Sequence, residues 1–274
     1  MKLYLNRYII NIIFLIYNFI LMSILIVPGN PYMPSAGLDP SWQWGIDHAI
    51  HYDLQFGKDI IFTYGPFGSY RFPDTMFTLF SYKYHLVVSL IFSFTVAISL
   101  SILLENKKII NKFFIPFGLF IALSIGHWIF FFFVQILFLM LVINMKESKD
   151  KILIYFLIIL VAFSALIKFS HFPTALLLFI GADIYLYYKN KVFYYITPVF
   201  LLSIVLFFIA SGQNLFNLFD YFIQSIQITS GYSEAMQISG SLSILLVFLF
   251  LSGWFFICLV RNYLLKKDLT KLFI

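Results

Sequence analysis

Long apolar runs separated by short polar connections make up most of this 274-residue chain. Several of these runs reach or approach the roughly 20 residues that an α-helix needs to cross a bilayer. Only 11% of the residues are charged, against about 25% in average soluble domains. The pattern therefore predicts an all-α fold, a polytopic bundle of about eight transmembrane helices that forms one membrane domain over residues 1–274.

Each predicted span is an apolar run that ends at charged residues, Gly or Pro. The run Phe113–Met145 is too long for one crossing, and Gly126-His127 near its middle predicts a helical hairpin that divides it. The predicted spans, in chain order, are Tyr8–Val27, Tyr84–Leu104, Phe113–Ile125, Trp128–Asn144, Ile152–Ile167, Pro173–Tyr188, Val192–Ala210 and Ser241–Val260.

The basic residues set the expected orientation, because short cytoplasmic loops of membrane proteins are enriched in Lys and Arg. With the N-terminus in the cytoplasm, all basic residues fall on the cytoplasmic side except Lys58, Arg71, Lys83 and Lys168. Outer loop 1 (residues 28–83) and outer loop 2 (211–240) then face away from the cytoplasm, and the tail 261–274 faces it.

The expected location follows from these spans together with the composition. Richness in Phe, Ile, Lys, Asn and Tyr indicates an AT-rich bacterial genome. We therefore expect a multi-pass protein of a bacterial cytoplasmic (inner) membrane with both termini in the cytoplasm. The net charge of +6 lies mostly in short connections between spans, so it does not indicate a nucleic-acid partner.

Outer loop 1 carries the most polar part of the chain, Asp39–Tyr70, with the sequence DPSWQWGIDHAIHYDLQFGKDIIFTYGPFGSY. A helix is expected over about Pro40–Tyr52, because Asp39 can cap its first amides and Pro40 suits its first position. The residues that would share one face of this helix are Trp42, Ile46 and Ala49. Such an aromatic and aliphatic face is typical of a helix in the membrane interface.

These features resemble the first periplasmic loop of the GT-C superfamily of integral-membrane glycosyltransferases. The resemblance consists of Asp39 after the first span, an aromatic residue three positions on, a second Asp, and Gly65-Pro66-Phe67-Gly68 before the second span. The superfamily includes protein mannosyltransferases and aminoarabinose transferases, which move a sugar from a polyprenyl-phosphate carrier to an acceptor outside the membrane.

The resemblance implies that Asp39 is the catalytic carboxylate. Many members have a second acidic residue directly after this Asp, whereas Pro40 follows it here. No cofactor is therefore assigned, and a divalent metal is left open.

Further polar residues of the outer side are candidates for binding substrate. Lys168 and His171 are candidates to grip a lipid phosphate, and Arg71 and Lys58 compete for that role. Outer loop 2 is expected to contribute a helical part, Leu215–Ile226, and an acid for acceptor or sugar hydroxyls. The full expected set is Trp42, Asp59, Arg71, Lys168, His171 and Glu234.

Several of these residues also have a structural interpretation. Asp39 as a cap, Glu234 as a solvated acid and Lys168 as a lysine that extends to the interface each fit the pattern. Asp183 lies inside a predicted span, and the nearby Lys189 and Lys191 favour an interfacial ion pair for it. His48 and His51 have a ligand-like spacing, but without a third ligand no metal site is expected there.

The expected function is a membrane glycosyltransferase that acts on the outer face, with membrane lipid and a polyprenyl-phosphate-linked sugar as partners. The alternative is a non-catalytic membrane protein, either a transporter or flippase for a lipid-linked sugar or an assembly subunit. A transporter usually shows charged or broken spans near the bilayer midplane, and the predicted spans carry almost no charge. The oligomeric state is left open.

Overall fold

The computed structural model describes residues 2–27, 38–71, 79–144, 148–235 and short pieces between 241 and 254. Within these residues the regular elements are all helical, which confirms the expected all-α class. They are α1 (Lys2–Ile26), α2 (Leu38–His51), the 3₁₀ helix η1 (Gly68–Arg71), α3 (Leu79–Leu103), α4 (Ile109–Ser124), α5 (His127–Asn144), α6 (Ser148–Ile167), α7 (His171–Asn190), α8 (Ile196–Ala210) and α9 (Asn217–Ala235).

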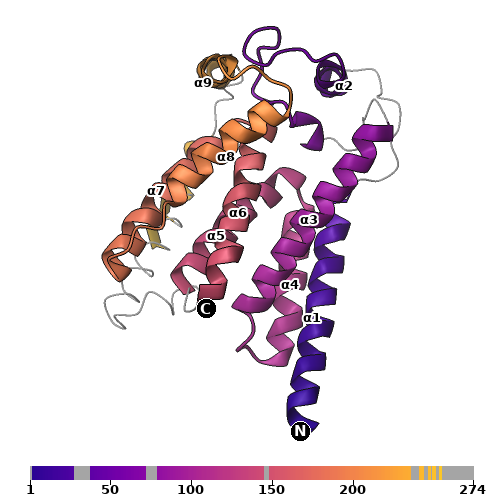
Figure 1. Ribbon diagram of the computed structural model, residues 1–274, viewed down its shortest axis with the longest axis vertical. Helices are drawn as coiled ribbons and strands as arrows, with labels where there is room; N and C mark the ends of the chain where they lie inside the picture. The colour runs from indigo at the N-terminus through magenta and orange to yellow at the C-terminus, as the bar shows by residue number, and fades with distance from the viewer. Residues whose placement is uncertain are drawn as a thin grey trace. The chain divides into compact units, whose positions relative to one another are not determined.

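The chain forms two compact units, residues 1–226 and 227–274. The first unit contains α1 to α8 and the beginning of α9. Its long helices run side by side, while α2 crosses one end of them and is seen end-on in Figure 1. The tail 261–274 and more than half of the predicted span Ser241–Val260 lie outside the described residues. The expectation of a single membrane domain stays a prediction.

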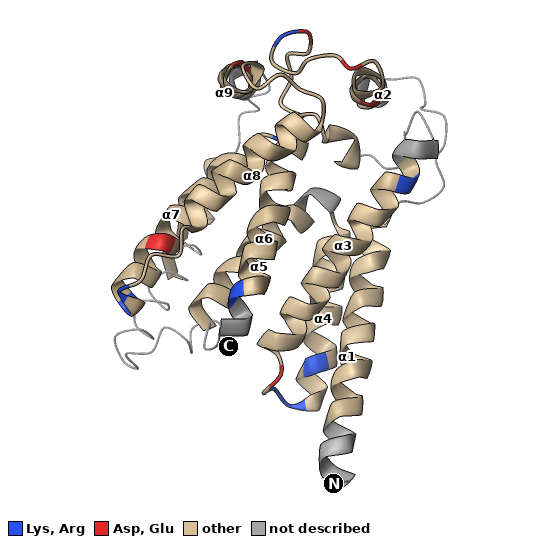
Figure 2. Ribbon diagram, in the orientation of Figure 1, with Lys and Arg blue, Asp and Glu red and all other residues tan. Residues whose placement is uncertain are grey.

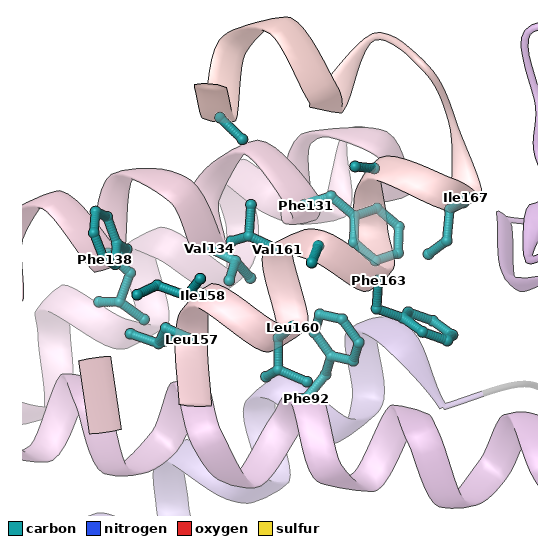
Figure 3. Close-up of a cluster of buried hydrophobic side chains, with 14 of the residues drawn as sticks. Phe92, Phe131, Val134, Phe138, Leu157, Ile158, Leu160, Val161, Phe163 and Ile167 are labelled. Atoms are coloured by element: carbon teal, nitrogen blue, oxygen red, sulfur yellow. The ribbon is translucent and has the colours of Figure 1, made fainter. Parts of the chain in front are cut away.

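Helix α6 is the centre of this bundle, since it contacts α3, α5, α7, α8 and η1. Figure 3 shows its side chains, among them Leu157, Ile158 and Val161, meeting aromatic and aliphatic residues of α3 and α5. The buried face alternates large residues with Ala162 and Ala165, and this lets neighbouring helices pack closely. The end of α6 is therefore held rigidly, and the candidate site is built on it.

The outer surface of the bundle is apolar. Helix α1 exposes Ile13, Ile16 and Ile24 while it buries Asn18, which donates a hydrogen bond to Ser101 on α3 at 3.4 Å. Figure 2 shows that Lys, Arg, Asp and Glu are sparse along the helices and gather near their ends and in the connections. A large continuous apolar surface is rare in soluble monomers, and buried hydroxyl and amide side chains are common between membrane helices.

Among the residues that the structure describes, two helical segments are long and apolar enough to cross a membrane, Tyr8–Ile26 and Tyr82–Leu103. The same residues include four shorter apolar helical segments: Ile109–Ser124, Ile129–Asn144, Lys151–Ile167 and Ile196–Ala210. The predicted hairpin at Gly126-His127 is confirmed, since α4 ends at Ser124 and α5 begins at His127. The number of spans stays a prediction.

The last of these helices begins later than the sequence predicts. Val192–Tyr195 precede α8, which starts at Ile196 after Tyr195, whose φ is +54°. The carboxylate of Asp183 on α7 supplies the missing cap, since it accepts hydrogen bonds from the backbone N–H groups of Ile196 at 3.0 Å and Thr197 at 2.8 Å. The first amides of a helix lack intrahelical acceptors, so this buried carboxylate determines where α8 starts.

The lysines expected to pair with Asp183 lie elsewhere, so that part of the sequence interpretation is wrong. Lys189 Nζ lies 5.5 Å from the ring centroid of Tyr185, and Lys191 Nζ lies 5.5 Å from that of Tyr188. Lysines beside tyrosines at helix ends are typical of a membrane interface. Asp183 belongs to the buried helix contact instead.

Candidate functional site

The predicted helix of outer loop 1 is confirmed as α2. It begins at Leu38, earlier than predicted, so Asp39 and Pro40 lie inside its first turn and not at the cap and first position. Backbone amides of this turn have no intrahelical acceptor, and Pro is tolerated there. The helix ends at His51, and Asp53 in the turn that follows has a φ of +53°, with the Leu54 N–H bonded to the Ala49 carbonyl at 2.9 Å. This is the left-handed helix end for which Gly is usual and a short polar residue such as Asp is tolerated.

After this turn, outer loop 1 pairs with the end of α6. The backbone N–H groups of Gly65 and Phe67 donate to the carbonyls of Ile167 and Leu166, both at 3.2 Å, and the Phe169 N–H donates to the Thr63 carbonyl at 2.8 Å. The last carbonyls of a helix need such external donors. Outer loop 1 thereby completes α6 and is fixed to the core of the bundle.

The glycines of this segment allow the backbone to approach its neighbours. A Cβ atom on Gly65 would lie 2.5 Å from the Leu166 carbonyl oxygen. A Cβ atom on Gly57 would meet the Asn217 carbonyl and lie 2.7 Å from the Tyr221 amide, and the φ of Gly57 is +89°. Close packing against α9 and α6 therefore explains Gly57 and Gly65.

Replacement of Gly57 by Ala is expected to lower the free energy of unfolding by about 2 kcal/mol, since strain at positive φ and steric overlap both contribute. The matched control is Gly212→Ala. Gly212 also has a positive φ, +80°, but no atom lies within 4 Å of its added Cβ, so about 1 kcal/mol is expected. Thermal unfolding of the purified variants measures both, and equal losses would contradict the packing explanation.

Two predicted substrate-binding residues meet at Tyr64. The Trp42 ring centroid of α2 lies 5.0 Å from that of Tyr64 and 5.3 Å from that of Phe62. Lys168, just beyond α6, places its Nζ 5.0 Å from the Tyr64 centroid, in the range of a cation–π contact. Tyr64 itself is buried, whereas Trp42 and Lys168 are half-buried. The fold thus assembles an aromatic and cationic cluster, Trp42, Phe62, Tyr64 and Lys168, from three separate segments.

Two other predicted residues have contacts of a structural kind. The Asp59 carboxylate accepts the Gln55 N–H at 2.9 Å and so closes the turn 55–60. His171 is buried at the start of α7, with its ring 4.6 Å from that of Phe132. Neither observation tests substrate binding, and their roles stay predictions.

The side chains of Asp39, Arg71 and Glu234 lie outside the described residues. Asp39 belongs to the first turn of α2, Arg71 ends η1, and Glu234 lies near the end of α9 in the second unit. Their functional roles stay predictions. Among the described residues, no group of three His, Cys, Asp or Glu side chains could hold a metal ion.

An acid that sequence reasoning passed over is Asp47 on α2, which is 3% exposed. Asp47 directly follows Ile46, which lies on the side of the helix that packs inward. This position next to Ile46 is the only feature of the sequence that indicates its burial. Its neighbour His48 lies among aromatic rings, 4.3 Å from the Tyr52 centroid. Asp47 is therefore a buried carboxylate of outer loop 1.

Below α2, the Tyr70 ring of η1 stacks on His85 of α3 with centroids 4.2 Å apart. Burial raises the pKa of the Tyr70 phenol above its ordinary value, and nearby Tyr84 adds to the rise. The phenol therefore stays neutral at physiological pH. The stack attaches the end of outer loop 1 to α3 as well as to α6.

Comparisons of the chain with protein-family models, with curated proteins and with solved structures found no match.

Proposed function

We propose that this chain is a membrane glycosyltransferase that moves a sugar from a polyprenyl-phosphate carrier to an acceptor on the outer face of the membrane. The observation that carries the proposal is the convergence of Trp42 and Lys168 on Tyr64 at one end of an apolar bundle. Asp39 lies on the same helix as Trp42, in the position that resembles the catalytic Asp of GT-C enzymes.

The chemistry of the cluster suits a lipid-linked sugar. The ammonium group of Lys168 is a fixed positive charge for a phosphate that becomes more negative as the sugar leaves. The Trp42 ring offers an apolar face beside it, and the carboxylate of Asp39 would take the proton from the acceptor hydroxyl. The apolar surface of α1 and the Lys–Tyr contacts at the far end of α7 support a membrane setting.

The test is sugar transfer from a polyprenyl-phosphate sugar in vesicles, with Lys168→Met as the variant. Methionine keeps the length of the side chain but removes the charge, so the KM for the lipid donor should rise about tenfold or more. Lys83→Met is the matched control, because Lys83 is an exposed lysine on α3. An unchanged KM in the Lys168 variant would remove Lys168 from the site.

The proposed orientation is tested by labelling single cysteines placed after Asn30 and after Gly212 in a Cys258→Ser background. The chain has only one native cysteine, so the background is free of other thiols. Both positions should react with a membrane-impermeant reagent added outside intact cells. Labelling of either position only after the membrane is opened would contradict the outer placement of both loops.

A second candidate function is a non-catalytic protein that binds or moves a lipid-linked sugar. Two acids of outer loop 1 favour this function, because both have a role in the fold. The Asp59 carboxylate accepts a backbone hydrogen bond within its own turn, and Asp47 is buried. The same vesicles separate the two functions. Binding or transbilayer movement of the lipid-linked sugar without transfer to any acceptor would support the second function and contradict the first.

A further inference from the structure

A second candidate site lies where the turn 55–60 of outer loop 1 meets the connection between α8 and α9. There a cavity of about 460 Å³ opens to the surface, within the range of small-molecule sites, about 300–1,000 Å³. It is lined by Gln55, Lys58, Gly212, Gln213, Asn214 and Asn217. Every lining side chain is an amide or an ammonium group, so the cavity suits a polar ligand and not an apolar one.

The walls of this cavity are held by two glutamines. Gln55 Oε1 accepts the Asn214 N–H at 2.7 Å, and Gln55 Nε2 donates to the Gly212 carbonyl at 3.2 Å. In return, Gln213 Oε1 accepts the Phe56 N–H at 2.7 Å. These reciprocal hydrogen bonds join segments more than 150 residues apart in sequence, so the polar groups around the cavity are positioned before any ligand arrives.

Three groups at the cavity remain available to a ligand. Within the part of the chain that the structure describes, no hydrogen bond engages Lys58 Nζ, Asn214 Nδ2 or Asn217 Oδ1. Asn214 Oδ1 accepts the Phe216 N–H at 3.0 Å, and Asn217 Nδ2 donates to Gln55 Oε1 at 3.3 Å. These bonds orient both side-chain amides. They leave Asn214 Nδ2 as a donor and Asn217 Oδ1 as an acceptor beside the Lys58 ammonium.

We propose that this cavity binds the hydroxyl groups of a sugar. A hydroxyl both donates and accepts hydrogen bonds, so neighbouring hydroxyls match a site that offers donors and an acceptor together. A purely anionic ligand fits less well, because the side-chain carbonyl of Asn217 at the cavity carries partial negative charge. The carboxylate of Asp59, next to Lys58 in the sequence and also exposed, would repel an anion as well. The inference goes beyond the proposed transfer reaction, since it uses neither Asp39 nor the cluster around Tyr64.

The experiment is saturation-transfer NMR on the full-length protein in an amine-oxide detergent, which avoids the sugar head groups of maltoside detergents. The probes are glucose, galactose, mannose and N-acetylglucosamine, with inorganic phosphate as a competitor. At least one sugar should show saturation transfer that phosphate does not displace. The proposal would be overturned if none of the four sugars received saturation from the protein. It would also be overturned if phosphate removed the sugar signal.

The variants are Lys58→Met and Asn214→Ala, alone and combined. Each removes one hydrogen-bonding group, so each should weaken sugar binding about fivefold, and the pair should abolish the signal at millimolar sugar. Lys83→Met and Asn190→Ala are the matched controls, since both residues are exposed and lie outside the cavity. Unchanged binding in the double variant, with an unchanged thermal midpoint, would also overturn the proposal.

The two proposals are separable. Asp39→Asn and Lys168→Met should leave sugar binding at the cavity unchanged while they impair transfer. If the chain transfers no sugar but still binds one through Lys58 and Asn214, the transferase proposal fails and the cavity stands. If Asp39→Asn or Lys168→Met abolishes the sugar signal, the binding belongs to the cluster around Tyr64 and the cavity proposal fails.

Discussion

Asp39→Asn is expected to abolish sugar transfer while the protein remains folded. The amide keeps the size of the side chain, but it cannot accept a proton at neutral pH. Removal of a general base costs about 10²–10⁴-fold in rate. Transfer from a polyprenyl-phosphate sugar in vesicles measures the loss, with the thermal midpoint as the check on folding.

The matched control for this variant is Asp53→Asn. Asp53 lies in the turn after α2 at a positive φ, which Asn also adopts readily, so neither stability nor transfer should change appreciably. A third variant, Asp47→Asn, shows which carboxylate of α2 is the base. Wild-type transfer by Asp39→Asn together with a large loss in Asp47→Asn would move the catalytic role to the buried acid.

Asp183→Ala should lower the free energy of unfolding by about 4 kcal/mol. The substitution leaves the backbone N–H groups of Ile196 and Thr197 without their acceptors in the contact between α7 and α8. Each buried donor without a partner costs about 1–3 kcal/mol. Asp183→Asn should lose about half as much, because its single amide oxygen still accepts one of the two hydrogen bonds.

Thermal unfolding of the purified variants in detergent measures this series, with Asp220→Ala as the control. Asp220 is an exposed acid in the first turn of α9, where its charge contributes about 0.3–1 kcal/mol. If Asp183→Ala is no more destabilising than Asp220→Ala, the carboxylate does not hold the start of α8. A loss of transfer without a loss of stability would instead indicate a functional role for Asp183.

The positions of most helices were predictable from the sequence, because each is a long apolar run with clear breaks. The predicted segment Trp128–Asn144 agrees with α5 within one residue at its start, and Gly126-His127 separates it from α4 as expected. Helix α2 was predictable as well, since Pro40 and the apolar positions Ile46 and Ala49 are local signals. Such patterns depend only on neighbours in the chain.

The contacts of the polar residues were decided by the tertiary structure. Asp183 was expected to pair with lysines next to it in sequence, but it caps a helix that starts 13 residues later. Trp42, Tyr64 and Lys168 come from separate segments, and the cavity lined by Lys58 and Asn214 joins the two outer loops. Hydrogen bonds and ring contacts between distant segments arise only when the helices pack, and hydrophobic periodicity carries no information about which polar groups then meet.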